Sequence, residues 1–170
     1  CLALAETAVR NGAELHLNTQ VIGLSPVDGG WLVTTDKGQM WARYVVNAAG
    51  VDCQQIHELA APQTFSIRPA RGQYYLLDKS EGNRVGRVIF QCPNEKGKGV
   101  LVAPTVHGNL IVGPNSEPVE GEDTSTTAAG LAFVRDKALK SVPSIQFNQS
   151  IRNFAGVRAV ADTGDFVINW

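Results

Sequence analysis

Two short glycine-containing turn sequences lie close together in the first part of the chain, and they constrain its fold more than any other feature. Asp28-Gly29-Gly30 and Asp36-Lys37-Gly38 bracket the segment from Trp31 to Thr35, and both are typical of β-hairpin turns. Turns this short join antiparallel neighbours, because a parallel connection needs a crossover of a dozen or more residues. Residues 20–43 are therefore predicted to form a small antiparallel meander.

A helix and a strand are predicted ahead of this meander. Over residues 2–11 apolar side chains recur at helical spacing, and Asn11-Gly12 is typical of a C-terminal cap. Over residues 14–18 Leu15 and Leu17 alternate with polar neighbours, which favours a strand.

A different pattern follows the meander at residues 44–50, Tyr-Val-Val-Asn-Ala-Ala-Gly. This apolar run is predicted to be a buried strand that ends in small residues, and Asp52 is predicted to cap a helix that ends near Ala60. A strand that leads through small residues into a helix lets the backbone approach a phosphate or a nucleotide. A close packing contact between strand and helix needs the same small residues, and the sequence leaves both interpretations open.

Pro62 marks a change in composition, after which most segments resemble strands. A long strand is predicted from Phe65 to Asp78, with Arg71-Gly72 as a bulge or a point of close backbone approach. The remaining predicted elements are a strand at 87–91, a polar loop at 93–99, strands at 100–105 and 110–112 paired across His107-Gly108-Asn109, an acidic surface loop at 117–123, a helix from Asp123 or Thr124 to about Lys140, an extended segment at 145–154, a turn at 155–158 and a strand at 166–168. The predicted fold class is α+β, with a mostly antiparallel sheet backed by helices.

Two arginines beside glycines are the candidate binding residues. Arg158 ends the sequence Phe-Ala-Gly-Val-Arg, and Arg71 lies in Ala-Arg-Gly-Gln. A guanidinium presents a planar, permanently charged fork that suits a carboxylate or a phosphate, while glycine lets the backbone come close. Pairing with a distant carboxylate within the protein is the competing interpretation, and the residues alone leave it open. No catalytic group and no metal ligand set is identified, so any difficult chemistry would belong to a cofactor.

Composition excludes several functional classes. A hydrophobic content of 44%, a charged content of 18% and a net charge of −1 indicate a globular protein and give no reason to expect nucleic acid or an anionic membrane surface as a partner. The apolar runs are too short to span a bilayer. The three cysteines have no metal-ligand spacing, and a cytoplasmic location is the default expectation.

The motifs taken together resemble a known family. They are Asn11-Gly12-Ala13, Asn18-Thr19-Gln20-Val21, Val45-Val46-Asn47-Ala48-Ala49-Gly50, Ile67-Arg68-Pro69-Ala70-Arg71-Gly72-Gln73, Gly99-Val100-Leu101-Val102-Ala103-Pro104-Thr105, Gly108-Asn109 with Gly113-Pro114, and Phe154-Ala155-Gly156-Val157-Arg158 with Asp165-Phe166. In this order they resemble the FAD-dependent oxidoreductases of the D-amino-acid-oxidase-like superfamily, and most closely the glycerol-3-phosphate dehydrogenase and 2-hydroxyglutarate oxidase type.

The resemblance implies a role for each candidate residue. Val21 would present its backbone to the adenine end of FAD, and Ala48, Ala49 and Gly50 would lie beside the dinucleotide. Arg71 would lie near the flavin on the substrate-domain sheet, and Arg158 would bind a small anionic substrate, glycerol 3-phosphate in first place. Residues 1–61 would then be part of the FAD-binding domain and residues 62–170 the substrate-binding domain, with hydride passing from substrate to flavin.

Departures from the family pattern limit this implication. The N-terminal strand-GxGxxG-helix of the family is absent from the chain, which opens without Met. We therefore expect an inactive piece of a longer protein that does not retain FAD by itself. Ala159 stands where family members usually carry Pro. Three alternatives remain: a 2-hydroxyglutarate oxidase of the same fold, an amino-acid oxidase with Tyr74 or Tyr75 near the ammonium group, and a non-catalytic α+β binding domain.

Overall fold

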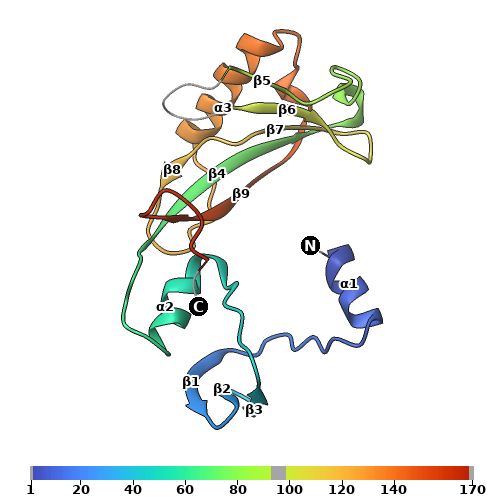
Figure 1. Cartoon of the computed structure of the whole chain (residues 1–170). Helices are drawn as coiled ribbons and strands as arrows, with labels where there is room; N and C mark the ends of the chain where they lie inside the picture. Colours follow the sequence, from blue (N-terminus) through green and yellow to red (C-terminus); the bar gives the residue numbers. More distant parts are fainter. Residues whose placement is uncertain (1, 93–98, 169–170) are drawn as a thin grey trace. The chain divides into compact units, whose positions relative to one another are not determined.

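The computed structural model describes residues 2–92 and 99–168, and it divides the chain into two compact units. The first unit is Cys1–Thr64 and the second is Phe65–Trp170. Figure 1 shows the elements of each unit, which are described separately below. The predicted boundary between residues 61 and 62 lies close to this division.

The first unit begins with helix α1 (Leu2–Arg10), which ends as predicted. Gly12 has a φ of +93°, a left-handed conformation that glycine adopts without steric cost. Its N–H donates to the Val9 carbonyl, and the N–H of Ala13 donates to the Ala8 carbonyl. These two hydrogen bonds satisfy carbonyls of the last helical turn, as in a Schellman motif.

The predicted meander is confirmed. Strands β1 (Val21–Val27), β2 (Gly30–Thr35) and β3 (Gly38–Ala42) form a three-stranded antiparallel sheet in the order β1-β2-β3. Gly29 and Gly38 have positive φ values of 73° and 143°. The turn residues thus adopt conformations that glycine tolerates, and the two short turns fix the register of the sheet.

The prediction of strands at residues 14–18 and 44–50 is wrong. Both segments are irregular, and Leu15, Leu17 and Val46 are 58%, 68% and 87% exposed. An apolar run becomes a strand only where another strand satisfies its backbone, and neither segment is paired within the described residues. The helix predicted after the second segment is present as the 3-10 turn η1 (Gly50–Asp52) and helix α2 (Cys53–Glu58). Asp52 occupies the N-cap position of α2, but its side chain makes no capping hydrogen bond.

Strand β4 (Ile67–Leu77) is the centre of the second unit. It pairs antiparallel with β9 (Ser150–Ala161) along its whole length. Since β9 occupies one edge of β4, the other edge is shared by β8 (Glu117–Pro118) and β7 (Leu110–Gly113). Strands β6 (Leu101–Pro104) and β5 (Ile89–Phe90) continue the sheet beyond β7. The antiparallel sheet of the α+β prediction is confirmed, with the hairpin β6–β7 where it was expected.

Of the two alternatives for Arg71-Gly72, the close backbone approach is present and the bulge is not. A Cβ at Gly72 would lie 2.8 Å from Cβ of Pro114, whereas the register between β4 and β9 is continuous there and its irregularity lies at Leu76/Leu77. Two other local predictions for this sheet are wrong. Residues 155–158 are not a turn but lie within β9, where Gly156 pairs with Gly72. Residues 166–168 form no strand.

Other differences concern the lengths of elements. The strand predicted at 87–91 is reduced to the two residues of β5, and the acidic loop at 117–123 begins with strand β8. Of the polar loop predicted at 93–99, residues 93–98 lie outside the described residues.

Helix α3 (Ala128–Ser141) packs on one face of the sheet and completes the core. The buried core residues are Leu77, Val100, Val102, Leu110, Val112, Val134, Ala138 and Ile145. The helix is capped by Thr127, whose hydroxyl accepts the N–H of Gly130, three or four residues after the predicted caps Asp123 and Thr124. Two 3-10 turns, η2 (Lys79–Glu81) and η3 (Phe147–Gln149), complete the unit. Across residues 2–92 and 99–168, no helix combines the length and apolarity needed to cross a membrane.

Gly82 is expected to be intolerant of any side chain. A Cβ built there would lie 1.8 Å from the carbonyl oxygen of Gly108, in the turn between β6 and β7. Gly82→Ala should therefore destabilise the protein by about 1–3 kcal/mol in denaturant unfolding, because the backbone must move. Gly86→Ala is the matched control, since a Cβ there meets nothing within 4 Å. Equal stability of the two variants would contradict the close approach.

Glu81 is expected to make stability depend on pH. Its buried carboxylate accepts hydrogen bonds from Nε and Nη2 of Arg84 and from the backbone N–H of Gln146. The Arg84 side chain is the largest cause of a lowered pKa for Glu81, and the Gln146 hydrogen bond adds to it. A carboxyl group with a lowered folded pKa stabilises the protein above its unfolded pKa, and this contribution is lost as pH falls through the folded value.

Thermal unfolding of wild type and of Glu81→Gln measures this contribution. At neutral pH the variant should unfold at a lower temperature, and the difference should shrink as pH falls below the ordinary glutamate pKa of 4.5. The exposed Glu120 provides a control, Glu120→Gln. A difference between wild type and Glu81→Gln that stays constant with pH would exclude the titration of Glu81 as its cause.

Candidate functional site

The two candidate arginines lie on opposite faces of the central strand pair. In the β4–β9 register Arg158 is opposite Ala70, and Arg71 is opposite Val157. Directly paired residues of antiparallel strands project to the same face, and consecutive residues project to opposite faces. The structure therefore does not bring Arg71 and Arg158 together in one site.

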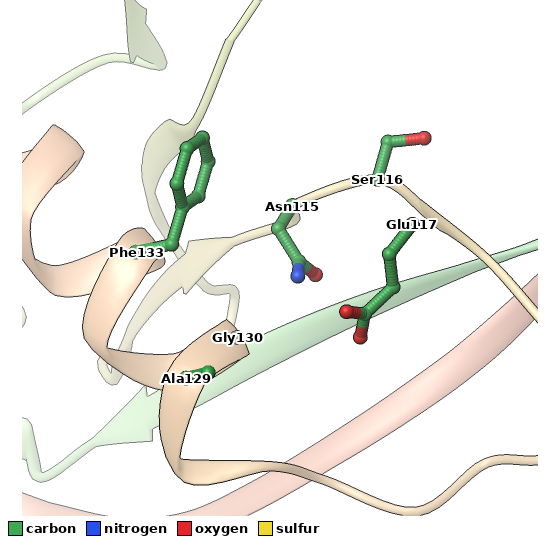
Figure 2. A pocket seen from close by; sticks show the side chains of 6 residues that line it. All are labelled: Asn115, Ser116, Glu117, Ala129, Gly130 and Phe133. Atoms are coloured by element: carbon green, nitrogen blue, oxygen red, sulfur yellow. The ribbon is translucent and has the colours of Figure 1, made fainter.

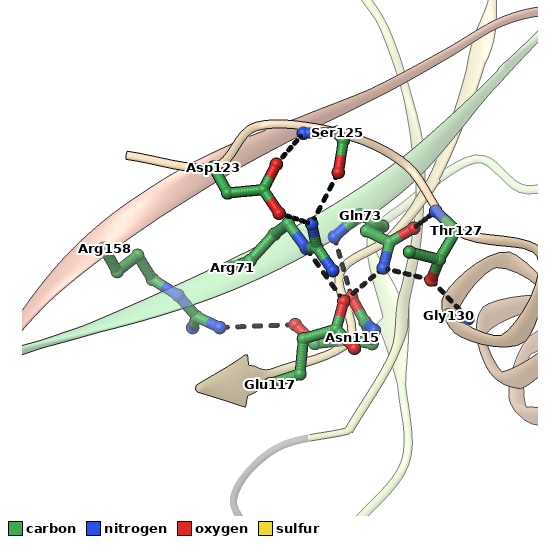
Figure 3. Close-up of polar contacts among 9 residues, drawn as sticks. All are labelled: Arg71, Gln73, Asn115, Glu117, Asp123, Ser125, Thr127, Gly130 and Arg158. Carbon is green, nitrogen blue, oxygen red and sulfur yellow. Dashed lines mark hydrogen bonds and ion pairs between the residues drawn. The ribbon is translucent and has the colours of Figure 1, made fainter. Parts of the chain in front are cut away.

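Arg71 is buried and already paired with carboxylates. Its Nε donates to Glu117 Oε1 at 2.9 Å, and its Nη1 donates to Asp123 and, at 2.8 Å, to Ser125 Oγ (Figure 3). Hydrogen bonds from the hydroxyl and backbone N–H of Ser125, with the Arg71 charge beside them, lower the pKa of Asp123. These contacts offset the charge of Arg71, so its geometry matches pairing within the protein and gives no support to substrate binding.

Gln73 extends this network to the start of helix α3. Its buried amide donates to Glu117 and to Thr127 Oγ1, and it accepts the backbone N–H of Thr127 at 2.7 Å. Both donors and the acceptor of the amide are thus satisfied. The side chain of Gln73 thus attaches the N-terminus of α3 to β4.

Arg158 has a different environment. It is exposed, and Nη2 donates to the backbone carbonyl of Asn115 at 3.3 Å (Figure 3). Within residues 2–92 and 99–168 it forms no ion pair with a carboxylate. A carbonyl orients the guanidinium without neutralising it, so Arg158 retains its positive charge and most of its five N–H donors for another partner.

At positions 70–74 of β4 and 154–158 of β9, the other residues on the face that carries Arg158 are small or aromatic. We call this surface the Arg158 face, and it consists of Ala70, Gly72 and Tyr74 of β4 with Phe154, Gly156 and Arg158 of β9. Tyr74 and Phe154 stack with their ring centroids 5.1 Å apart. Tyr75 projects to the other face and packs edge-on against Phe147 beside the core. Of the two tyrosines considered for an amine substrate, only Tyr74 is on the Arg158 face.

A small open pocket lies between helix α3 and the segment after β7. It is lined by Asn115, Ser116, Glu117, Ala129, Gly130 and Phe133 (Figure 2). Its one charged group is the carboxylate of Glu117, which is engaged by Arg71 and Gln73. The pocket therefore does not have the chemistry expected for an anionic substrate.

The residues considered for the cofactor belong to the first unit. Val21 is the first residue of β1 and is half-buried. Ala48 and Ala49 lead into η1, which begins at Gly50; all three residues are exposed, and Gly50 has a φ of +61°. The side chain of Asn47 holds this turn, since Nδ2 donates to the Cys53 carbonyl and Oδ1 accepts the Ala49 N–H. A small, exposed turn fits the close approach of a dinucleotide.

Asn115 was not identified from the sequence. Its Oδ1 accepts the backbone N–H of Gln73 at 2.7 Å, and its carbonyl is the partner of Arg158. The preceding Gly113-Pro114 follows the strand predicted at 110–112 and gave no indication of this role. A link between residues far apart in sequence has no local pattern.

Comparison with known families identifies the class of protein to which the chain belongs. Residues 1–170 match the DAO family, described as FAD dependent oxidoreductase. The chain belongs to this family of flavin-dependent oxidoreductases, which confirms the resemblance drawn from its motifs.

Two individual relatives show which members of this family the chain is similar to. The chain is 45% identical over 168 residues to a glycerol 3-phosphate dehydrogenase of Caloramator mitchellensis, covering 98% of this chain and 35% of that protein. It is 33% identical to a glycerol 3-phosphate oxidase of Mycoplasma genitalium, covering 99% of this chain and 45% of that protein. The chain thus spans less than half the length of these relatives.

Solved structures share the fold. The L-alpha-glycerophosphate oxidase of Mycoplasma pneumoniae, solved with FAD bound, superposes with a TM-score of 0.81 at 31% identity and covers 99% of this chain and 45% of that one. The glycine oxidase of Geobacillus kaustophilus superposes with a TM-score of 0.74 at 22% identity and covers 96% of this chain and 42% of that one. The second similarity shows the fold alone.

Arg71→Ala tests the structural role of Arg71. The substitution leaves Glu117 and Asp123 beside each other without a cation, and it should destabilise the protein by about 2 kcal/mol. This is below the roughly 3–5 kcal/mol for breaking a fully buried pair, because both carboxylates are partly exposed. The control is Arg135→Ala, which removes an exposed pair with Asp136 and should change stability by less than about 1 kcal/mol. Denaturant unfolding measures both, and equal effects would contradict the structural assignment.

Proposed function

We propose that the chain is part of an FAD-dependent oxidoreductase that removes hydride from a small anionic 2-hydroxy compound. Glycerol 3-phosphate is the preferred substrate. The substrate class is supported by the relatives at 45% and 33% identity, which carry glycerol 3-phosphate in their names. One structural observation carries the proposal: Arg158 presents an exposed guanidinium whose contact, among the described residues, is a neutral carbonyl.

Arg158 binds the anionic end of the substrate in this proposal. A guanidinium forms two parallel, charge-assisted hydrogen bonds with a phosphate or a carboxylate, which fixes the orientation of the anion as well as its position. The neighbouring position on the Arg158 face is occupied by the paired glycines Gly72 and Gly156. Pro114 covers the Gly72 position, but a Cβ at Gly156 would meet nothing within 4 Å, so the substrate carbons can lie close to the sheet at Gly156 beside the bound anion.

FAD supplies the hydride acceptor when it is bound, and the residues of this chain bind and orient the substrate. Residues 1–64 contribute part of the FAD-binding domain, with Val21 and the turn Ala48–Gly50 beside the dinucleotide. The exposed apolar side chains of this unit support its assignment to a larger domain; they include Leu2, Leu4, Val9, Leu15, Leu17 and Val46. Residues 65–170 contribute the substrate-binding sheet. We expect the chain alone to bind FAD weakly.

An amino-acid substrate is the second candidate, because Tyr74 lies on the Arg158 face. One side of its ring stacks against Phe154 and is not available to an ammonium group. The non-catalytic binding domain receives no support from the family assignment.

Arg158→Ala in the full-length protein that contains this chain tests the proposal. Glycerol 3-phosphate should reduce and bleach the flavin of wild type. In the variant the apparent affinity should fall at least about tenfold, which corresponds to roughly 1.4 kcal/mol of lost anion binding. Stopped-flow absorbance at the flavin band measures both.

Arg152→Ala is the matched control, since Arg152 is an exposed arginine of the same strand, about 20 Å away along it. An affinity unchanged in Arg158→Ala would remove Arg158 from the site. Wild-type flavin that is reduced by an amino acid and not by glycerol 3-phosphate would favour the second candidate.

A further inference from the structure

Asn115 links the segment between β7 and β8 both to strand β4 and to Arg158. It is 8% exposed and lies between β7 and β8, on the edge of β4 opposite to β9. Its Oδ1 accepts the backbone N–H of Gln73 at 2.7 Å, while its own carbonyl accepts Nη2 of Arg158 at 3.3 Å. The side chain thus attaches the segment to β4, and the backbone of the same residue contacts the candidate substrate arginine (Figure 3).

Gly72 makes this contact possible. A Cβ at Gly72 would lie 2.8 Å from Cβ of Pro114 and 3.3 Å from the carbonyl oxygen of Asn115. Because residue 72 has no side chain, the segment 114–115 approaches β4 closely there. Arg158 starts from the neighbouring strand, opposite Ala70, and its side chain reaches across β4 to this carbonyl.

The anchor of Asn115 is itself held in place. Gln73 provides the backbone N–H, and its fully buried side chain is bound to Glu117 and to both the hydroxyl and the N–H of Thr127. Movement of this part of β4 would break contacts with the N-terminus of α3. The carbonyl that receives Arg158 is therefore fixed through Asn115 to the most buried part of the sheet.

We propose that Asn115 is a positioning residue for Arg158, an inference that rests on the proposed function of that arginine. The carbonyl holds one Nη2 hydrogen and restricts the rotamers of a long side chain before the substrate arrives. Ordering a free arginine side chain costs conformational entropy that would otherwise weaken anion binding. The neutral acceptor leaves the charge of Arg158 available.

A double-mutant cycle in the full-length holoenzyme tests the inference. Its members are wild type, Asn115→Ala, Arg158→Ala and the double variant, each assayed for glycerol 3-phosphate oxidation by flavin reduction. In the wild-type background Asn115→Ala should raise KM about three- to tenfold and leave kcat within about twofold. In the Arg158→Ala background it should have no further effect on KM, because the group through which it acts is gone.

Two controls separate positioning from folding. Ser116→Ala changes the exposed neighbouring residue and should leave KM unchanged, and flavin content and thermal midpoint are measured for every variant. If Asn115→Ala is not obtained as a holoenzyme, Asn115→Ser replaces it in the cycle, since serine keeps a shorter side-chain oxygen. The serine variant should show a smaller rise in KM that also disappears without Arg158.

The outcomes distinguish the inference from the proposed function. If Arg158→Ala raises KM while Asn115→Ala and Asn115→Ser do not, the inference is overturned and the proposed function stands. If the effects of the two sites simply add, Asn115 has only a structural role and the inference is again overturned. If Arg158→Ala itself leaves KM unchanged, the proposed role of Arg158 fails first.

Discussion

The antiparallel pairing of β4 with β9 is the constraint on which the candidate site depends. The two strands are far apart in the sequence, and their register determines which side chains meet on each face. Because side chains alternate with a period of two, a slip of one residue in either strand would exchange its faces. Arg71 and Arg158 would then change surroundings completely, although the sequence near each would be the same. The residue type alone does not define the function of either arginine.

The two faces of the β4–β9 pair give their arginines different surroundings. On the face that carries α3, Arg71 is removed from water, and a buried cation is tolerated only when its charge and its donors are satisfied. Glu117, Asp123 and Ser125 do this, and they connect the loop before α3 to β4. On the other face Arg158 remains in solvent, where an uncompensated cation costs little. The same side chain thus stabilises the fold at one position and remains available for an anion at the other.

Local signals allowed part of the fold to be predicted from the sequence. The turns at Gly29 and Gly38, the cap at Gly12 and the hairpin β6–β7 depend on nearby residues, and all were predicted correctly. The segments 14–18 and 44–50 have apolar patterns, but a strand also requires a partner, and the pattern does not supply one. The turn predicted at residues 155–158 was wrong because a glycine near Arg158 was interpreted as a turn residue. Gly156 instead lies in an extended strand, where it pairs with Gly72.

The site was predictable only as a set of candidates, because its geometry depends on long-range contacts. Glycine-flanked arginines could be selected from the sequence, but their faces followed from the register, and Asn115 became visible only through its bonds to Gln73 and Arg158. The type of partner also matters. A carboxylate at the position of the Asn115 carbonyl would hold Arg158 more strongly and would also compete with an anionic ligand for its charge. A carbonyl orients the guanidinium while the charge remains, and this combination suits the anion-binding role proposed for Arg158.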